Sequence, residues 1–194
     1  MKAIVLHRTG GPEVLQWHPD WPTPEPGPGE VRVQARAIGV GRPDVLVRSG
    51  RYKWMPPLPA IPGSEMAGTV EALGAGVQGL AIGDPVLVSA RELTQRGGAY
   101  AECQCAPADA LFRLPAGLSF VDAVSLPNVQ LALALLQAGG GAADIRAVLV
   151  TGAAGGVASA LTQVARAAGL RVIGSARTAE RREQALAQGC HAVL

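Results

Sequence analysis

Residues 146–181 read RAVLVTGAAGGVASALTQVARAAGLRVIGSARTAER, and this stretch decides the fold of the chain. Its apolar start, residues 147–150, is rich in β-branched side chains and predicts a strand. Small residues at 151–158 permit a sharp turn, after which apolar residues at helical spacing predict a helix that ends at Gly169. Residues 170–175 supply a second strand. The stretch therefore predicts a βαβ unit.

The turn of this unit has the chemistry of a phosphate-binding site. The first backbone amides of a helix have no partner inside the helix, and the helix dipole adds positive potential there. The glycine positions of the G-x-G-x-x-G dinucleotide pattern fall on Ala153, Gly155 and Ala158, so only the middle one is glycine. With strands on both sides, the turn predicts dinucleotide binding. The alternative is an ordinary turn of small residues that packs a helix against a strand.

The end of the second strand indicates which dinucleotide is bound. An acidic residue about 20 residues beyond the turn would bind the ribose 2′-hydroxyl of NAD and repel the extra phosphate of NADP. Ala176 occupies that position, and the two guanidinium groups and the hydroxyl of Arg177, Thr178 and Arg181 suit a phosphate dianion. We therefore expect NADPH, unless Arg181 and Arg182 are only the solvated face of the next helix. The predicted cofactor-binding residues are Ala153, Ala154, Gly155, Gly156, Val157, Ser175, Arg177, Thr178 and Arg181.

Composition places the chain among ordinary soluble proteins. It has 194 residues, 48% of them hydrophobic, and its net charge of +2 comes from dispersed arginines rather than a basic stripe for nucleic acid. Glycine, proline and charged residues interrupt the apolar stretches well before the ~20 residues of a membrane span. Residues 1–3 lead into a strand rather than a signal peptide. We expect a cytoplasmic protein that binds neither nucleic acid nor membrane.

The 3 cysteines form no disulfide pattern. Cys103 and Cys105 lie two residues apart on one predicted strand, and Cys190 is remote from them in the sequence. This spacing favours reduced structural thiols over the alternative of metal ligands.

The chain before the βαβ unit is mostly β. Residues 2–6 and 14–17 predict a hairpin, and the alternation at 31–37 is typical of a half-buried strand. Further strands are predicted at 65–73, 85–89 and 100–105, with glycine turns between them, so we expect a small barrel. After Pro115 the pattern becomes helical, with a capping pattern at Ser119 and Asp122. Helices are predicted at 129–137 and 179–188, and a last strand is predicted at 191–194.

These segments resemble, in the same order along the whole chain, the quinone oxidoreductases of the medium-chain dehydrogenase/reductase superfamily. The resemblance implies a mixed α/β fold, with a GroES-like β-barrel catalytic domain at 1–118 and linking helices plus a partial Rossmann domain at 119–194. It also implies NADPH-dependent reduction of quinones or activated enones by hydride transfer. The resemblance rests on Gly10-Gly11-Pro12-Glu13-Val14-Leu15, Pro26-Gly27-Pro28-Gly29-Glu30-Val31, Arg48-Ser49-Gly50, Ile61-Pro62-Gly63-Ser64-Glu65, Gly83-Asp84 and Gly97-Gly98-Ala99-Tyr100-Ala101-Glu102.

Two positions separate the zinc-dependent members of this superfamily from the others. Catalytic zinc requires a thiolate and an imidazole, which the family supplies from a cysteine and a histidine. Gly41 and Ser64 stand at those positions here, and the four cysteines of the family's structural-zinc lobe have no counterpart. The chain therefore resembles the zinc-independent branch, and we expect no bound metal.

The resemblance implies one catalytic candidate, Tyr52, which matches the tyrosine of the motif Arg-Ser-Gly-x-Tyr. Its hydroxyl would donate a hydrogen bond or a proton to the substrate. The alternative is that Tyr52 and Trp54 only fill a proline-rich loop. The family asparagine that lines the substrate pocket is replaced by Gly41. Asp44 and Arg48 also match the family motif, and the alternative for them is a structural ion pair.

The predicted strands 1 to 3 make only the first half of a doubly wound domain, whose strand order is 3-2-1-4-5-6. The strand at 147–150 would then be an apolar edge, which favours aggregation or pairing with a second copy as a homodimer. We expect the N-terminal part, or a shortened form, of an NADPH-dependent oxidoreductase. The alternative is a non-catalytic dinucleotide-binding or interaction module derived from such an enzyme.

Overall fold

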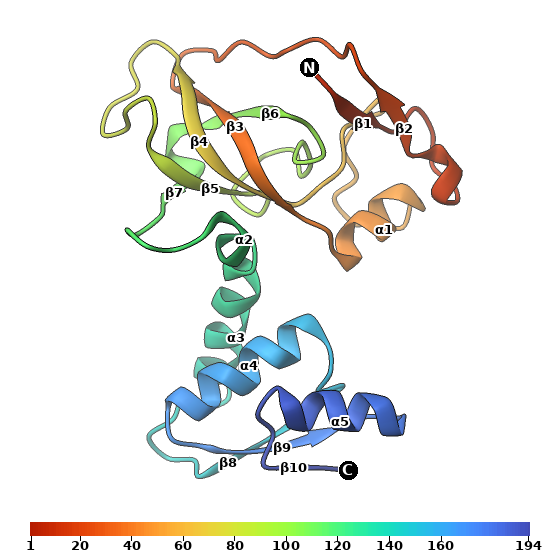
Figure 1. The fold of residues 1–194 in the computed structure, drawn as a ribbon, viewed down its shortest axis with the longest axis vertical. Coiled ribbons are helices and arrows are strands. Elements are labelled where there is room, and N and C mark those ends of the chain that lie inside the picture. Colours follow the sequence, from red (N-terminus) through yellow and green to blue (C-terminus); the bar gives the residue numbers. More distant parts are fainter. The chain divides into compact units, whose positions relative to one another are not determined.

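The computed structural model describes residues 1–194, which form two compact units, Met1–Ser125 and Leu126–Leu194. The first unit is built on a curled, five-stranded antiparallel sheet with the strand order β6-β3-β4-β5-β7 (Figure 1). The edge strands β6 and β7 are not hydrogen-bonded to each other, so the expected barrel is an open sheet in its hydrogen bonding. The strands are β3 (Glu30–Gly39), β4 (Glu65–Leu73), β5 (Pro85–Ser89), β6 (Cys103–Pro107) and β7 (Leu111–Arg113).

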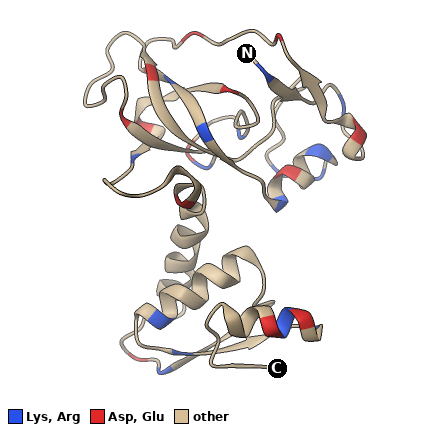
Figure 2. Ribbon diagram, viewed as in Figure 1, with Lys and Arg blue, Asp and Glu red and all other residues tan.

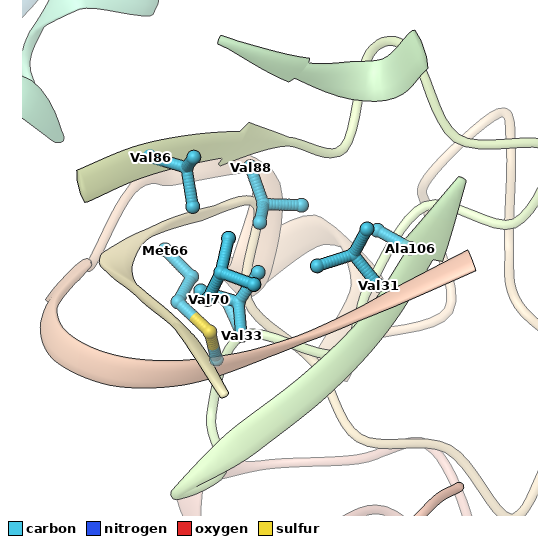
Figure 3. Packing of buried hydrophobic residues seen from close by; sticks show 8 residues of the cluster. Val31, Val33, Met66, Val70, Val86, Val88 and Ala106 are labelled. Atoms are coloured by element: carbon cyan, nitrogen blue, oxygen red, sulfur yellow. The ribbon is translucent and has the colours of Figure 1, made fainter. Parts of the chain in front are cut away.

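Alternate residues of these strands form the core of the first unit, because successive side chains of a strand point to opposite faces of the sheet. The apolar side chains from β3, β4, β5 and β6 meet on one face (Figure 3). The predicted ranges of β4 and β5 are confirmed, whereas β6 begins at Cys103, three residues later than predicted. The buried members of the cluster are Val31, Val33, Met66, Val70, Val86, Val88, Ala99 and Ala106.

The predicted N-terminal hairpin is confirmed by the antiparallel pairing of β1 (Ala3–Val5) with β2 (Gln16–His18). The return strand starts later than predicted, since Pro12–Val14 forms the 3-10 turn η1. A second 3-10 turn, η2 (Ala108–Ala110), precedes β7. The helix α1 (Arg42–Arg48) was not predicted, although a proline in its first turn is a start signal.

The boundary between the units lies later than the predicted division at 118/119. The helix α2 (Phe120–Ala123) contacts β3 and β4, so it belongs with the first unit. The predicted cap is present, because the Ser119 hydroxyl accepts a 3.0 Å hydrogen bond from the Asp122 amide.

The second unit contains a three-stranded parallel sheet with the order β10-β9-β8 (Figure 1). Its elements, in chain order, are α3 (Leu126–Ala138), β8 (Ala147–Thr151), α4 (Gly156–Ala167), β9 (Arg171–Ser175), α5 (Ala179–Ala187) and β10 (Ala192–Val193). The βαβ unit is therefore confirmed, and its strands lie in the order of the first half of a Rossmann domain. The helix α3 starts before the predicted 129, because a proline is tolerated in a first helical turn.

Small residues allow the elements of the second unit to approach closely. A Cβ atom at Gly174 in β9 would lie only 2.8 Å from Cβ of Ala153 and 2.9 Å from Sγ of Cys190. Ala153 is fully buried, and with Ala165 and Val172 it belongs to the core of this unit. The strand β8 pairs only with β9, and Leu149 at this edge is 62% exposed. No helix of the structure combines the length and the apolar character needed to cross a membrane.

Candidate functional site

The turn between β8 and α4 leaves helical amides free for a ligand. Gly152 has φ +62°, a backbone conformation in which glycine avoids a steric cost, and its carbonyl accepts a 2.9 Å hydrogen bond from the Gly155 amide. The helix begins at Gly156, and no side chain caps its N-terminus. The first amides of α4 therefore lack a protein partner, which is the arrangement that binds a phosphate at a helix N-terminus.

A cavity of about 700 Å³ lies beside this turn, at the carboxyl ends of β8 and β9. It brings together four of the predicted cofactor residues, Ser175, Arg177, Thr178 and Arg181, which line it with Gly152, Ala176 and Leu194. Neither arginine forms an ion pair. The helix α5 begins here, and its Thr178 hydroxyl accepts a 3.3 Å hydrogen bond from the Arg181 amide. The two exposed guanidinium groups remain available to an anion.

A second cavity of about 480 Å³ is lined by Gly152, Gly155, Gly156 and Val157 among others. Gly152 therefore borders both cavities. Ala153 lines neither of them, because its side chain is buried and its amide donates a 3.0 Å hydrogen bond to the Ser175 carbonyl. Ala154 also lies outside both linings. The structure thus assigns Ala153 to holding the turn against β9. In the neighbouring helix α5, an acidic residue lies on each side of the adjacent Arg181 and Arg182 (Figure 2).

In the first unit, Asp44 accepts three hydrogen bonds. The donors are the Gly41 amide at 2.7 Å, the Ser64 hydroxyl at 3.2 Å and the Tyr100 hydroxyl at 3.1 Å. The alternative of an ion pair between Asp44 and Arg48 is wrong, because Arg48 instead donates a 2.7 Å hydrogen bond to the Gly10 carbonyl. Asp44 is 6% exposed. Its three hydrogen-bond donors are neutral, so no cation in the structure stabilises its charge.

Glu65 and Tyr100 have perturbed acidities next to Asp44. The pKa of Glu65 is raised from 4.5 to about 7, mainly by burial and further by the Asp44 charge, while Arg91 acts in the opposite direction. Burial also raises the pKa of Tyr100, and its position as the donor to Asp44 acts in the same direction. A carboxyl group that titrates near neutral pH is able to exchange protons under ordinary conditions. The sequence analysis missed this pair, because only the fold brings it to Asp44.

Gly41 and Ser64, where the resemblance places the ligands of catalytic zinc in the zinc-dependent enzymes, are hydrogen-bonded to Asp44. The Gly41 amide and the Ser64 hydroxyl are both donors to its carboxylate. No group of three or more His, Cys, Asp or Glu side chains is arranged to hold a metal ion. The three cysteines are unpaired, and burial raises the pKa of Cys105 to about 11, so this thiol is protonated at neutral pH.

Tyr52 lies in the loop after α1, where its ring is half-buried against a cluster of Leu6, Val14 and Val47. The Trp54 ring meets it edge-on, with 5.6 Å between centroids. The phenolic oxygen accepts a 3.1 Å hydrogen bond from Nη1 of Arg96. The ring therefore fills space in the loop, and the hydroxyl also has a polar partner that the sequence analysis did not identify.

Comparison with known proteins identifies the class. Residues 27–116 match the model of the alcohol dehydrogenase GroES-like domain. A quinone oxidoreductase of Sus scrofa is 38% identical over 199 residues, covering all of this chain and 58% of the relative, and one of Pseudomonas aeruginosa is 37% identical, covering 97% and 56%. The chain is therefore similar to the quinone oxidoreductases of the medium-chain dehydrogenase/reductase superfamily.

Solved structures extend this comparison from the sequence to the fold. The Escherichia coli quinone oxidoreductase in complex with NADPH superposes with a TM-score of 0.87 at 34% identity, covering 100% of this chain and 58% of that one. A mycobacterial protein in complex with NADPH gives a TM-score of 0.85 at 39% identity, with the same coverage. These solved structures are similar to the chain over its whole length, and they are quinone oxidoreductases or a protein bound to NADPH. The chain spans a little under three fifths of the length of these relatives.

Proposed function

We propose that this chain provides the catalytic domain and the adenosine-binding half of an oxidoreductase that reduces quinones or activated enones with NADPH. The cavity at the carboxyl ends of β8 and β9 is the observation that carries this proposal. It combines two unpaired guanidinium groups, Arg177 and Arg181, with an alanine at the position where an acid would select NAD. The two similar structures solved with NADPH support the same cofactor.

The residues present fit NADPH. The uncapped N-terminus of α4 would hold the pyrophosphate, while Arg177, Arg181 and the Thr178 hydroxyl would hold the 2′-phosphate. The bound cofactor would supply a hydride to the electron-poor carbon of the substrate. Strands β8 to β10 contribute only the first mononucleotide-binding half, so the 194 residues themselves hold the adenosine side of the cofactor.

We propose that the reaction needs no metal ion. Asp44 already accepts three hydrogen bonds, and two of their donors stand where a zinc enzyme has its cysteine and histidine. Tyr52 is the proposed catalytic residue, as the donor of a hydrogen bond or proton to the reduced substrate. Its hydroxyl has a polar partner but no protein acceptor.

A second candidate function is a non-catalytic module that binds a dinucleotide or another chain. The exposed edge strand β8 favours it, since an unpaired apolar edge is a template for a second copy. The quinone oxidoreductase relatives favour the catalytic proposal over this one. The homodimer and the cytoplasmic location expected from the sequence remain predictions, and sedimentation velocity tests the first of them.

NADPH oxidation by the purified chain in the presence of benzoquinone tests the catalytic proposal. We expect the 194-residue chain alone, which holds only the adenosine side of the cofactor, to oxidise NADPH no faster than its Tyr52→Phe variant. A chain extended by a second mononucleotide-binding half should show saturable oxidation with NADPH, weaker activity with NADH, and a decrease of about 10²-fold or more in kcat for Tyr52→Phe, the range for loss of a general acid. Oxidation with NADH at the same efficiency would contradict the cofactor assignment. An unchanged kcat in Tyr52→Phe of the extended chain would contradict the role of this tyrosine.

A further inference from the structure

Arg96 connects the two aromatic side chains of the Tyr52 loop. Its Nη1 lies 3.1 Å from the Tyr52 hydroxyl, and its Cζ lies 4.0 Å from the centre of the Trp54 ring. The Tyr52 and Trp54 rings are in edge-to-face contact at an angle of 67°. A guanidinium at this distance over an indole is attracted by the ring quadrupole. Trp54 therefore holds the guanidinium where it can reach the phenol.

Arg96 has no carboxylate partner. The ion pairs of the structure are Lys2–Glu102, Arg32–Glu25, Arg32–Glu71 and Arg113–Asp84, and none of them includes it. It is half-buried and lines a cavity of about 580 Å³ with the side chains of Thr94, Gln95 and Gln104. A half-buried cation that lacks an anion in the protein can stabilise an anion that forms next to it.

The direction of the hydrogen bond between Arg96 and Tyr52 determines whether the phenolic hydrogen is available to a substrate. A guanidinium can only donate, so the Tyr52 oxygen is the acceptor, and the phenolic hydrogen is left for another group. The structure gives that hydrogen no protein acceptor. The second tyrosine of the chain is arranged in the opposite way, because the Tyr100 hydroxyl donates to Asp44. Tyr52 thus lies beside a cation with its proton free, whereas the Tyr100 proton is held by an anion.

We propose that Arg96 is a positioning residue that orients the Tyr52 hydroxyl as a donor and stabilises the phenolate formed when it gives up its proton. The inference rests on the proposed function. A bound NADPH would supply the hydride that forms a new C–H bond at the electron-poor carbon of the quinone or enone, and the electron pair of the C=C–C=O system would move to the oxygen. That oxygen takes the proton of Tyr52, whose O–H electron pair stays on the phenolate beside Arg96. Water then returns a proton to Tyr52.

Nitration by tetranitromethane tests this role without cofactor or turnover, because the reagent attacks phenolate rather than phenol. Peptide mass spectrometry would follow Tyr52 and Tyr100 separately in the 194-residue chain. We expect Arg96→Gln to slow nitration of Tyr52 by about tenfold, the effect of losing one hydrogen bond to a charged group, and to leave Tyr100 unchanged. Arg96→Lys should recover part of the rate, and Arg91→Gln, an exposed arginine of the same segment, should have no effect.

Whether Arg96→Gln slows or speeds the nitration of Tyr52 distinguishes the proposed role of Arg96 from a role in packing alone. Loosening of the loop would expose Tyr52 and speed its nitration, so a rate in Arg96→Gln equal to or above that of the wild type overturns the proposal. If Arg96→Gln does not fold, Trp54→Leu, which removes the ring under the Arg96 guanidinium, gives the same comparison. The proposed function fails separately, through absence of NADPH binding, which leaves the nitration result unaffected.

Discussion

The hydroxyl of Tyr100 donates a 3.1 Å hydrogen bond to Oδ2 of Asp44, which lies in the first turn of the short helix α1. The same carboxylate accepts from the Gly41 amide before the helix and from the Ser64 hydroxyl before β4. One buried anion therefore joins three segments that are far apart in the sequence. It also supplies part of the charge that perturbs Glu65 and Tyr100.

Asp44→Ala should lower the stability of the chain by about 2–3 kcal/mol, because it leaves several half-buried donors without an acceptor. Chemical denaturation would measure the change. The control is Asp20→Ala, an exposed aspartate that we expect to alter stability by less than about 0.5 kcal/mol. Equal effects of the two substitutions would show that the Asp44 contacts contribute nothing.

Glu65→Gln should become more stabilising as the pH rises. The pKa of Glu65 is raised from 4.5 to about 7, so the folded state holds this proton more tightly than the unfolded state does. The wild type therefore loses stability between these two values, and the loss is complete above the higher one. We expect the variant to match the wild type near about pH 5 and to exceed it by about 1–2 kcal/mol near about pH 8, since partial exposure reduces the full effect.

Thermal melting of both proteins across this range measures the difference. Glu92→Gln, a substitution of an exposed glutamate, is the matched control and should show no such dependence. A difference between Glu65→Gln and the wild type that stays constant with pH would mean that Glu65 has an ordinary pKa.

Elemental analysis of the purified, tag-free chain should find no stoichiometric zinc. The reason is that Gly41 and Ser64 occupy the ligand positions of the zinc enzymes and are hydrogen-bonded to Asp44. A chelator should leave the melting temperature unchanged, because no structural metal would be removed. One zinc ion per chain would require a different branch of the superfamily.

The parts of the fold that were predicted from sequence depend on local signals. The βαβ unit follows from hydrophobic periodicity and small residues within one continuous stretch, and β4 and β5 follow from alternation between glycine turns. The helix α1 was missed because it has only seven residues and is held by hydrogen bonds to distant segments. The spacing of Asp44 and Arg48 suits an ion pair on a helix, but donors 20 and 56 residues away bind Asp44 instead.

The candidate site also contains residues that could be predicted from the sequence and residues that only the fold brings together. The residues of the β9–α5 loop are close in sequence, so their common location in one cavity could be predicted. Arg96 lies 44 residues from Tyr52, and no sequence pattern connects them. The glycine pattern predicts that Ala153 binds the cofactor. Only the fold shows that the Ala153 amide already donates a hydrogen bond to the Ser175 carbonyl.

Ala176→Asp should reduce the affinity for 2′,5′-ADP by at least about tenfold, because a carboxylate in the cavity repels the 2′-phosphate. The affinity for 5′-AMP should stay close to that of the wild type. Ala176→Asn is the control for size, since it adds nearly the same volume without the charge. A similar loss in both variants would indicate steric exclusion rather than charge selection.

The affinity of Arg177→Ala for 2′,5′-ADP tests the assignment of the NADPH site most directly. Calorimetry should show a loss of about 1.5–3 kcal/mol relative to the wild type, the range for a hydrogen bond to a charged group, with binding of 5′-AMP nearly unchanged. Arg182→Ala is the control, because this exposed arginine lies next to Arg181 but outside the cavity lining. Equal losses for the two nucleotides, or an equal loss in Arg182→Ala, would contradict the assignment.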